Sequence, residues 1–171
     1  DGADAVLLDL SGQAHRMLGA TFSPYDDALR SSLLALQQPG VNELHEAAVL
    51  GNRLVQIYAH TVHRLLTEAG VSPDNVAAIG CHGQTVRHCP EAGYTVQLCN
   101  GAALAELTGI TVVCDFRSRD IAAGGEGAPL VPAFHGAMFA DRNVHRVIVN
   151  IGGIANITDL PPNGQVRGFD T

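Results

Sequence analysis

The sequence predicts an α/β fold with a mixed sheet, and three observations lead to this prediction. Short apolar runs typical of strands alternate along the chain with stretches of helical periodicity. One of these stretches, Val41–Ala69, repeats its apolar residues at three- and four-residue steps over several helical turns. The 19 glycines among 171 residues exceed the usual share of about 7%, which favours many tight turns.

The chain opens with a predicted β-hairpin and a helix. Strand-like runs at Asp4–Leu10 and Arg16–Phe22 flank the turn residues Ser11 and Gly12. A helix is predicted at Asp26–Leu36 because its leucines fall on one face.

The long helix predicted at Val41–Ala69 has a boundary residue at each end. Asn42 is a candidate N-cap residue, and Gly70 is a candidate C-cap residue with Pro73 just beyond it. These residues define the limits of the helix more sharply than its apolar pattern does.

Polar loops follow two short buried strands. A strand at Val76–Gly80 runs into the polar loop Cys81–Arg87, and a strand at Ile110–Cys114 runs into the charged loop Asp115–Asp120. Because ligands in open α/β sheets bind beyond the carboxyl ends of strands, we expect functional side chains in these loops and at the chain end near Asp170.

The rest of the chain divides into strands, helices and one glycine loop. The remaining predicted elements are a strand at Tyr94–Leu98, a helix at Ala102–Thr108, the glycine loop Gly124–Gly127, a helix at Pro129–Phe139, and strands at Val147–Asn150, Ile154–Leu160 and Val166–Phe169.

The charge composition excludes several classes of chemistry. The net charge is −7 and no basic stripe is visible, so nothing in the sequence favours nucleic-acid binding. All ten basic residues are arginines, which excludes a lysine Schiff base and a phosphate loop that depends on lysine. No uncharged run is longer than Gly127–Ala140, which is too short for a membrane span, and no signal-peptide pattern is visible at the N-terminus.

The cysteine pattern favours reduced thiols over disulfides. The four cysteines are Cys81, Cys89, Cys99 and Cys114. A chain of this length can bury a hydrophobic core without disulfide bonds, so we interpret the cysteines as small, buried or half-buried side chains. Two of them adjoin a histidine, but the absence of paired CxxC spacing disfavours a structural zinc site.

A faint internal repeat relates the two ends of the chain. The segment Gly2–Leu10 has four of its nine residues in common with Gly152–Leu160. The similarity is either a coincidence between short apolar strands or the trace of a duplicated fold. In the second case, each half opens with a strand and a glycine turn whose N–H groups bind phosphate.

Four motifs are more specific than composition or periodicity. They are GCHGQTV at Gly80–Val86, the long run at Thr108–His135 that includes CDFRSRD and GEGAP, VNIGGIANI at Val149–Ile157, and GFDT at Gly168–Thr171. In this order and spacing they resemble the anhydro-N-acetylmuramic acid kinase family. The resemblance covers the whole chain and is strongest from residue 76 onward.

The resemblance implies a fold and a cellular setting. The family belongs to the acetate and sugar kinase/Hsp70/actin superfamily, in which two ribonuclease-H-like lobes flank a cleft. Residues 1–142 would form the N-terminal lobe, and residues 143–171 would form the opening strands of the second lobe. The family is bacterial and cytoplasmic, and its members are often homodimers.

The resemblance also implies a reaction. The enzyme would use ATP, with Mg²⁺, and water to open the 1,6-anhydro bridge of anhydro-N-acetylmuramic acid. Phosphorylation of O6 would give N-acetylmuramic acid 6-phosphate and ADP during recycling of the cell wall. Because the family's phosphate loop ends at Asp1-Gly2 and its pattern continues past Thr171, we expect the chain to be incomplete and inactive alone.

Motif matches assign residues to the reaction and to ATP. Asp170 matches the family's catalytic base, although a strand-end aspartate can also simply cap a turn. The residues expected to face the ATP phosphates are Asp1, Gly2, Asn150, Gly152 and Gly153. Asp1 is also the candidate Mg²⁺ ligand. The paired glycines alone would equally fit a plain hairpin turn.

Other motif residues are assigned to the sugar. The residues expected to bind it are His82, Gln84, Thr85, Arg117 and Arg119. The first three offer donors and acceptors to hydroxyl and acetamido groups, and the two arginines could bind the lactyl carboxylate. A network of ion pairs between these arginines and Asp115 and Asp120 is the alternative interpretation.

The chain departs from the family pattern at several positions. Gln97-Leu-Cys-Asn100 stands where the family commonly has Gln-Ile-Gly-Asp, and Ser118 and Glu126 replace arginine and glutamine. These departures keep two alternatives open: a kinase for another amino sugar, and a non-catalytic nucleotide-binding module of the same superfamily.

Overall fold

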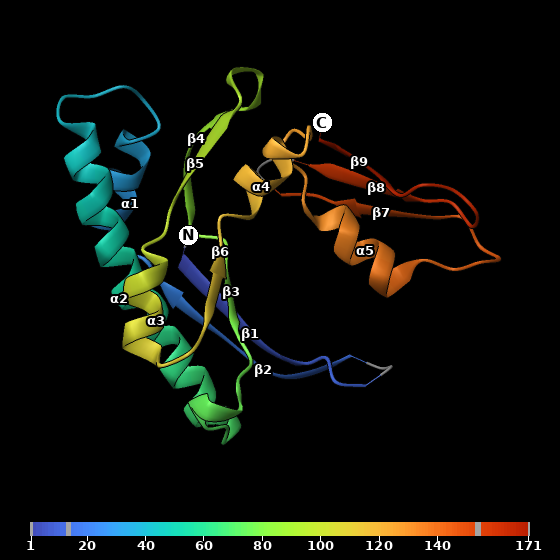
Figure 1. Cartoon of the computed structure of the whole chain (residues 1–171), viewed down its shortest axis with the longest axis horizontal. Coiled ribbons are helices and arrows are strands. Elements are labelled where there is room, and N and C mark those ends of the chain that lie inside the picture. The colour runs from blue at the N-terminus through green and yellow to red at the C-terminus, as the bar shows by residue number, and fades with distance from the viewer. Residues whose placement is uncertain (1, 13–14, 153–154, 171) are drawn as a thin grey trace. The chain divides into compact units, whose positions relative to one another are not determined.

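The computed structural model describes residues 2–12, 15–152 and 155–170, which form an α/β structure with several small sheets (Figure 1). The chain separates into two compact units. The first unit comprises residues 1–88 and 96–115, and the second comprises residues 89–95 and 116–171.

The first unit begins with the predicted hairpin. Strands β1 (Gly2–Asp9) and β2 (Arg16–Pro24) pair in antiparallel register. Asp9 closes the turn, because its carboxylate accepts hydrogen bonds from the Ser11 hydroxyl at 2.6 Å, the Ser11 N–H at 3.0 Å and Arg16 Nη2 at 3.1 Å. These bonds, that from the Ser11 hydroxyl above all, lower the pKa of Asp9 to about 2.

Two helices follow where the sequence predicts them, as α1 (Asp27–Ala35) and α2 (Glu43–Ala69). The Asp26 side chain caps α1 by accepting from the Leu29 N–H at 2.7 Å. Gly70 ends α2 in the left-handed conformation, as predicted. Asn42 occupies the N-cap position of α2, but its φ of 60° is left-handed and its side chain makes no capping bond.

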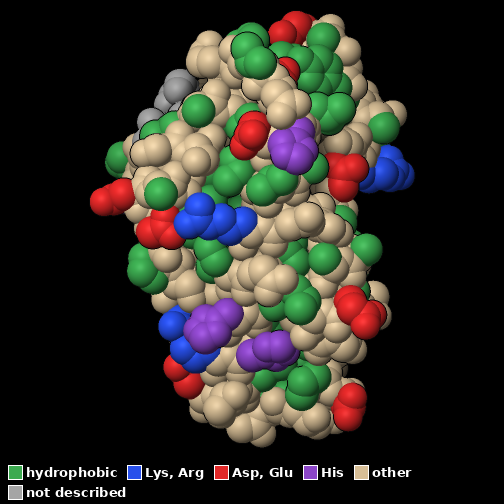
Figure 2. Space-filling view, turned by 90° about the vertical axis from the view of Figure 1, so that its left-hand side faces the viewer, with side chains coloured by type: hydrophobic (Ala, Val, Ile, Leu, Met, Phe, Trp, Pro, Cys, Tyr) green, Lys and Arg blue, Asp and Glu red, His purple; other side chains and the backbone are tan. Residues whose placement is uncertain are grey.

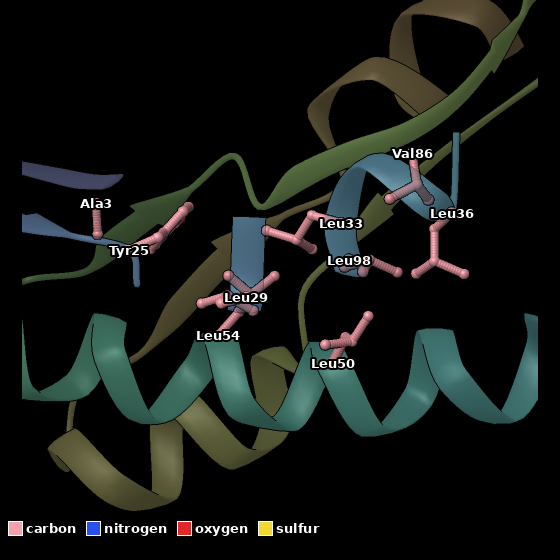
Figure 3. Close-up of a cluster of buried hydrophobic side chains, with 9 residues drawn as sticks. All are labelled: Ala3, Tyr25, Leu29, Leu33, Leu36, Leu50, Leu54, Val86 and Leu98. Atoms are coloured by element: carbon pink, nitrogen blue, oxygen red, sulfur yellow. The ribbon is translucent and has the colours of Figure 1, made fainter. Parts of the chain in front are cut away.

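The core of the first unit lies between these helices and the strands (Figure 3). Leu29 of α1 and Leu54 of α2 are fully buried in this cluster. The other buried members of this cluster are Ala3, Tyr25, Leu33, Leu36, Leu50, Val86 and Leu98. The leucine periodicity of both helices therefore identifies the residues that join the helices to the strands.

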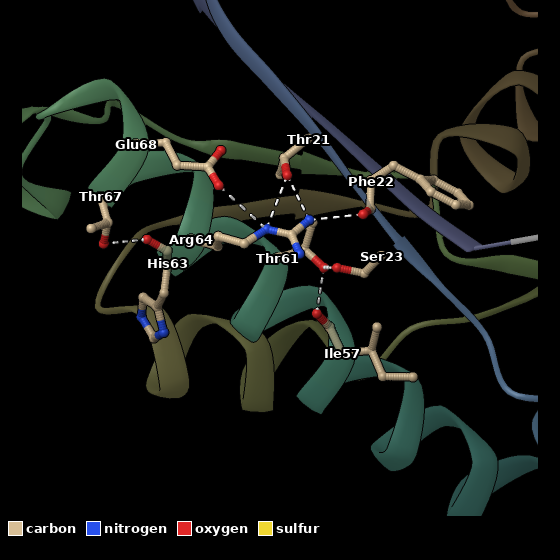
Figure 4. A network of polar contacts seen from close by, with 9 residues as sticks. All are labelled: Thr21, Phe22, Ser23, Ile57, Thr61, His63, Arg64, Thr67 and Glu68. Carbon is tan, nitrogen blue, oxygen red and sulfur yellow. Dashed lines mark hydrogen bonds and ion pairs between the residues drawn. The ribbon is translucent and has the colours of Figure 1, made fainter.

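Polar contacts fasten α2 to β2 (Figure 4). Arg64 donates to Thr21 Oγ1 through Nε and Nη2, at 3.0 and 2.5 Å, and to the Phe22 carbonyl oxygen at 2.8 Å. The buried Thr61 hydroxyl donates to Ser23 Oγ at 2.7 Å. These bonds satisfy polar groups that α2 covers when it packs on the hairpin.

The remaining elements of the first unit include its single described parallel strand pair. Strand β3 (Ile79–Cys81) pairs in parallel with β6 (Val112–Cys114), and β5 (Tyr94–Leu98) leads into α3 (Gly101–Thr108). The 3-10 turn η1 (Pro73–Asn75) belongs to this unit, whereas η2 (Pro90–Ala92) is assigned to the second unit.

Two loop predictions are wrong. Most of Cys81–Arg87 is not a loop, because Gln84–Cys89 forms strand β4, which pairs with β5. The burial of Val86 in the core supports this polar strand. Most of Asp115–Asp120 is likewise not a loop, because Phe116–Ala122 forms helix α4. At seven residues, α4 is too short for its periodicity to stand out in the sequence.

The second unit contains a three-stranded antiparallel sheet with a helix against it. The sheet has the order β7 (Arg146–Asn150), β8 (Asn156–Leu160) and β9 (Arg167–Asp170). Helix α5 (Val131–Phe139) packs on β8, where the buried His135 Nδ1 lies 2.8 Å from Thr158 Oγ1. These strands and this helix fall where the sequence predicts them, with shifts of one or two residues at their ends.

Charged side chains are dispersed over the face of the molecule shown in Figure 2, where arginines alternate with acidic, histidine and apolar groups. Within the described parts of the chain, no helix combines the length and the apolar character that crossing a bilayer requires.

Candidate functional site

Three polar residues form a row across the sheet of the second unit. Asn150 at the end of β7 is the register partner of Asn156 on β8, and Asn156 is the register partner of Asp170 at the end of β9. Directly opposed residues on neighbouring strands project from the same face of a sheet. The sheet therefore places the predicted catalytic base, Asp170, on the same face as the predicted phosphate-facing residue Asn150, with Asn156 between them.

Asn156 is a candidate site residue that the sequence reasoning did not assign. Its side-chain Oδ1 is buried and makes no hydrogen bond among the residues that the structure describes. A buried acceptor without a donor is costly, and such groups are frequent where a ligand binds. Asn156 belongs to the motif Val149–Ile157, so the sequence contained this residue but gave no reason to single it out.

The path of β9 depends on a glycine that precedes Asp170. A Cβ atom on Gly168 would lie 2.9 Å from Cγ of Pro129 and closer still to Cγ of Pro132. This close approach seats β9 against the start of α5. It explains in physical terms the glycine of the motif Gly168–Thr171, because a larger residue would push the strand and Asp170 outward.

Arg117 and Asp170 interact electrostatically within the second unit. Burial lowers the pKa of the half-buried Arg117, and the negative charge of Asp170 opposes that shift. Arg117 Nη1 also donates to the carbonyl oxygen of Gly127 at 2.5 Å, while Asp120 Oδ2 accepts from the N–H of the same residue at 2.8 Å. Arg117 and Asp120 thus bind the two main-chain polar groups of Gly127 in the glycine loop.

The other predicted residues for phosphate and carboxylate binding are less well defined. Arg119 lies on α4 and is exposed, and Gly152 is exposed after β7. Gly2 begins β1 in the first unit, opposite Pro24. Asp1 and Gly153 lie outside the described residues, so the prediction that they bind ATP or Mg²⁺ is not tested.

The three predicted sugar-binding residues other than the arginines lie in the first unit around β4. His82 is exposed and donates from Nδ1 to the Gly83 carbonyl oxygen at 2.8 Å. Gln84 and Thr85 belong to β4, and the Thr85 hydroxyl accepts from Gln97 Nε2 at 3.3 Å.

An open depression of about 500 Å³ lies beside these residues, between α2 and the start of α3. Gln97, Asn52 and Asn100 are its polar lining residues. Asn100 Nδ2 donates to Asn52 Oδ1 at 2.7 Å, and Asn100 Oδ1 accepts from the Ala103 N–H at 3.0 Å. The sequence reasoning noted Asn100 only as a departure from the family pattern and did not assign Asn52 or Gln97.

Metal binding finds little support in the described residues. No group of three or more histidine, cysteine, aspartate or glutamate side chains in the described ranges is arranged to hold a metal ion. The predicted Mg²⁺ ligand, Asp1, lies outside those ranges. The prediction that Asp1 binds Mg²⁺ is therefore not tested.

Comparison with known proteins identifies relatives of this chain. The family model described as anhydro-N-acetylmuramic acid kinase matches residues 1–171. Curated anhydro-N-acetylmuramic acid kinases of Nitrosomonas europaea and Nitrosospira multiformis are 62% and 64% identical to it, over 99% of this chain and 47% of their own. That of Thiobacillus denitrificans is 57% identical over the whole chain and 46% of its own length. The chain thus spans about half the length of these curated relatives.

Proposed function

Because the chain belongs to the anhydro-N-acetylmuramic acid kinase family, we propose that the protein containing it opens the 1,6-anhydro bridge of anhydro-N-acetylmuramic acid and phosphorylates O6. The substrates are ATP, water and the anhydro sugar, and the products are N-acetylmuramic acid 6-phosphate and ADP. The observation that carries the proposal is the row of Asn150, Asn156 and Asp170, with Arg117 close to Asp170.

Asp170 is the proposed general base. Its carboxylate takes a proton from water as the water oxygen attacks the anomeric carbon, and the bond from that carbon to O6 breaks. O6 in turn attacks the γ-phosphorus, and ADP leaves. A carboxylate held within hydrogen-bond reach of the attacking water accelerates such a step by about 10²–10⁴-fold.

The polar row and Arg117 have proposed binding roles. Asn150 and the glycine turn at Gly152 and Gly153 face the phosphates of ATP, since backbone N–H groups without a neighbouring Cβ approach phosphate closely. Arg117 binds the lactyl carboxylate of the sugar with two of its N–H groups. Its bond to Gly127 fixes the position of the guanidinium before substrate arrives.

The remaining candidate residues have proposed roles in binding the amino sugar and the phosphates. His82, Gln84 and Thr85 contact hydroxyl and acetamido groups, and Arg119 assists Arg117 at the carboxylate. Asp1 and Gly2 complete the phosphate loop. Mg²⁺ accompanies ATP through phosphate oxygens and water, and Asp1 remains its proposed ligand.

Several proposals concern the whole protein. We infer ribonuclease-H-like lobes, with residues 1–142 in the first and residues 143–171 opening the second, in a cytoplasmic bacterial enzyme that forms homodimers. We expect residues 1–171 alone to release no sugar-dependent ADP, because closure of two lobes is needed to exclude water and align the reacting groups.

The test is ADP release by the complete reading frame with anhydro-N-acetylmuramic acid, with N-acetylmuramic acid, and without sugar. Release with the anhydro sugar alone supports the proposal. Release with N-acetylmuramic acid favours a kinase for another amino sugar, and release with neither sugar from folded protein favours a non-catalytic nucleotide-binding module.

The Asp170→Asn variant tests the proposed base. We expect turnover to fall at least about 10²-fold with folding retained. Asp159→Asn is the matched control, because Asp159 belongs to the same sheet but lies outside the polar row and pairs with His145. Near-normal turnover of Asp170→Asn would move the base to another residue.

A further inference from the structure

Three of the four cysteines meet in the first unit. Cys81 ends β3, its register partner Cys114 ends β6, and Cys99 directly follows β5. The Cys99 thiol donates to Cys81 Sγ at a sulfur–sulfur distance of 3.5 Å, and Cys114 also contacts Cys99. Cys81 is buried, whereas Cys99 and Cys114 are half-buried.

The backbone fixes the approach of Cys81 and Cys99. Gly83 has a φ of 72°, and a Cβ atom there would lie 2.6 Å from the Leu98 carbonyl oxygen and 3.0 Å from Cys99 Cβ. Only glycine allows the chain after Cys81 to lie this close to the end of β5. The two sulfur atoms are therefore neighbours because of the path of the main chain.

The two thiols differ in acidity. The pKa of Cys81 is lowered because its sulfur accepts hydrogen bonds from the Cys99 thiol and from the Gly83 N–H, although burial opposes the shift. The pKa of Cys99 is raised because its thiol donates to Cys81 and because it is partly buried. A thiolate beside a protonated thiol is the arrangement in which one sulfur reacts first and the other resolves the product.

We propose that Cys81 and Cys99 are a redox-modification site, which a hydroperoxide oxidises to a disulfide between the end of β3 and the end of β5. The Cys81 thiolate attacks the terminal oxygen of the hydroperoxide, which forms a sulfenic acid and releases hydroxide or alkoxide. Cys99 sulfur attacks the sulfenic sulfur, loses its proton and displaces hydroxide. With hydrogen peroxide, two thiols and one peroxide give one disulfide and two waters.

The depression beside α2 brings a small oxidant to Cys99, whose sulfur lies 3.5 Å from that of the buried Cys81. Cys99 is one of its lining residues, together with Asn100 and Asn52. Hydrogen peroxide is close in size to water, so it can enter an open depression of about 500 Å³. A disulfide sulfur–sulfur bond of about 2 Å requires the atoms to move roughly 1.5 Å closer than the observed 3.5 Å.

Closing the disulfide moves residues with proposed roles. Cys99 precedes Asn100, which caps α3 and bonds to Asn52, and Cys81 precedes His82. We therefore expect oxidation to lower sugar-dependent turnover. This consequence rests on the proposed function, whereas formation of the disulfide does not.

Peptide mapping after oxidation tests the disulfide directly. The complete protein is reduced, treated with hydrogen peroxide, alkylated and digested with trypsin and Glu-C. Cleavage after arginine and glutamate places each cysteine of this chain in its own peptide, at residues 69–87, 88–91, 92–106 and 107–117. The expected product joins 69–87 to 92–106, with a mass about 2 Da below the sum of the reduced peptides, and dithiothreitol separates it.

Cysteine variants provide the controls. Cys99→Ser abolishes the linked peptide, and Cys99→Ala does the same if the serine variant fails to fold. Cys89→Ser leaves the linked peptide unchanged. Accumulation of sulfinic acid at Cys81 without a link, or a link of Cys99 to Cys114, would overturn the proposal.

Turnover provides the second readout. Sugar-dependent ADP release is expected to fall at least about tenfold on oxidation, because a displacement of about 1 Å at a substrate site can cost 10²-fold in rate. Dithiothreitol restores it, and Cys99→Ala resists the loss. Unchanged turnover in fully linked protein would overturn the regulatory consequence. Absence of turnover in reduced protein would instead overturn the proposed function and leave the mapping result to decide the disulfide.

Discussion

Substitution of Asn156 can distinguish a structural role of its side chain from a functional one. Its Oδ1 is buried without a donor among the described residues, between Asn150 and Asp170. Substitution by leucine, which is similar in shape, removes the acceptor and keeps the packing volume. We therefore expect Asn156→Leu to be more stable than the natural protein and less active.

The size of both effects follows from the buried acceptor. A buried polar group without a partner costs about 1–3 kcal/mol. Because the Asn156 residue as a whole is half-buried, we expect the variant to gain the lower end of this range, ~1 kcal/mol. If the same Oδ1 accepts a hydrogen bond from water or substrate during the reaction, its loss costs a further 1–3 kcal/mol, which corresponds to a decrease in turnover of about 5–150-fold.

Urea denaturation and ADP release measure the two effects on the same preparation. An increase in the urea midpoint with an unchanged m value reports the gain in stability. Asn163→Leu is the control, because Asn163 is exposed in the turn before β9. Destabilisation of Asn156→Leu by more than about 1 kcal/mol would refute the reasoning, because Oδ1 would then have a partner in the folded protein.

Two further predictions concern the first unit. Leu54→Ala removes a fully buried side chain and should lower the free energy of unfolding by about 2–5 kcal/mol. Leu44→Ala on the same helix, at an exposed position, should change it by less than about 0.5 kcal/mol in urea denaturation; equal effects would contradict the assigned core. Because the pKa of Asp9 is lowered to about 2, chiefly by the Ser11 hydroxyl, the turn keeps this stabilisation above the unfolded pKa of about 4 and loses it as the pH falls toward 2. Ser11→Ala should raise the midpoint of Asp9 in a carboxyl NMR titration, and an unchanged midpoint would contradict the assignment.

Residue periodicity and end residues in the sequence correctly predicted the first two helices. Leucines at helical spacing mark one face of each helix predicted at Asp26–Leu36 and Val41–Ala69, and Gly70 marks the end of the second. Both helices form within a few residues of the predicted bounds. Strand β4 was missed because its sequence is polar. It is stabilised by pairing with β5 and by the burial of Val86 in the core, and neither can be read from the local sequence. Tertiary pairing, rather than residue preference, decides the conformation of such a segment.

The candidate site was predictable as a set of motifs but not as an arrangement. Motif matching assigned Asn150 and Asp170 to different partners in the reaction, and it passed over Asn156, which lies between them in the sheet. A shift of one residue in the register of β8 would turn Asn156 to the opposite face, and nothing local in the sequence fixes that register. The contacts that do fix it are distant in sequence: Thr158 beside His135 of α5, and Gly168 against the prolines that begin that helix. The burial of Asn156 Oδ1 thus follows from the packing of α5 on the sheet. Substitution of Gly168 should therefore disturb the row of Asn150, Asn156 and Asp170, although Gly168 is not part of that row.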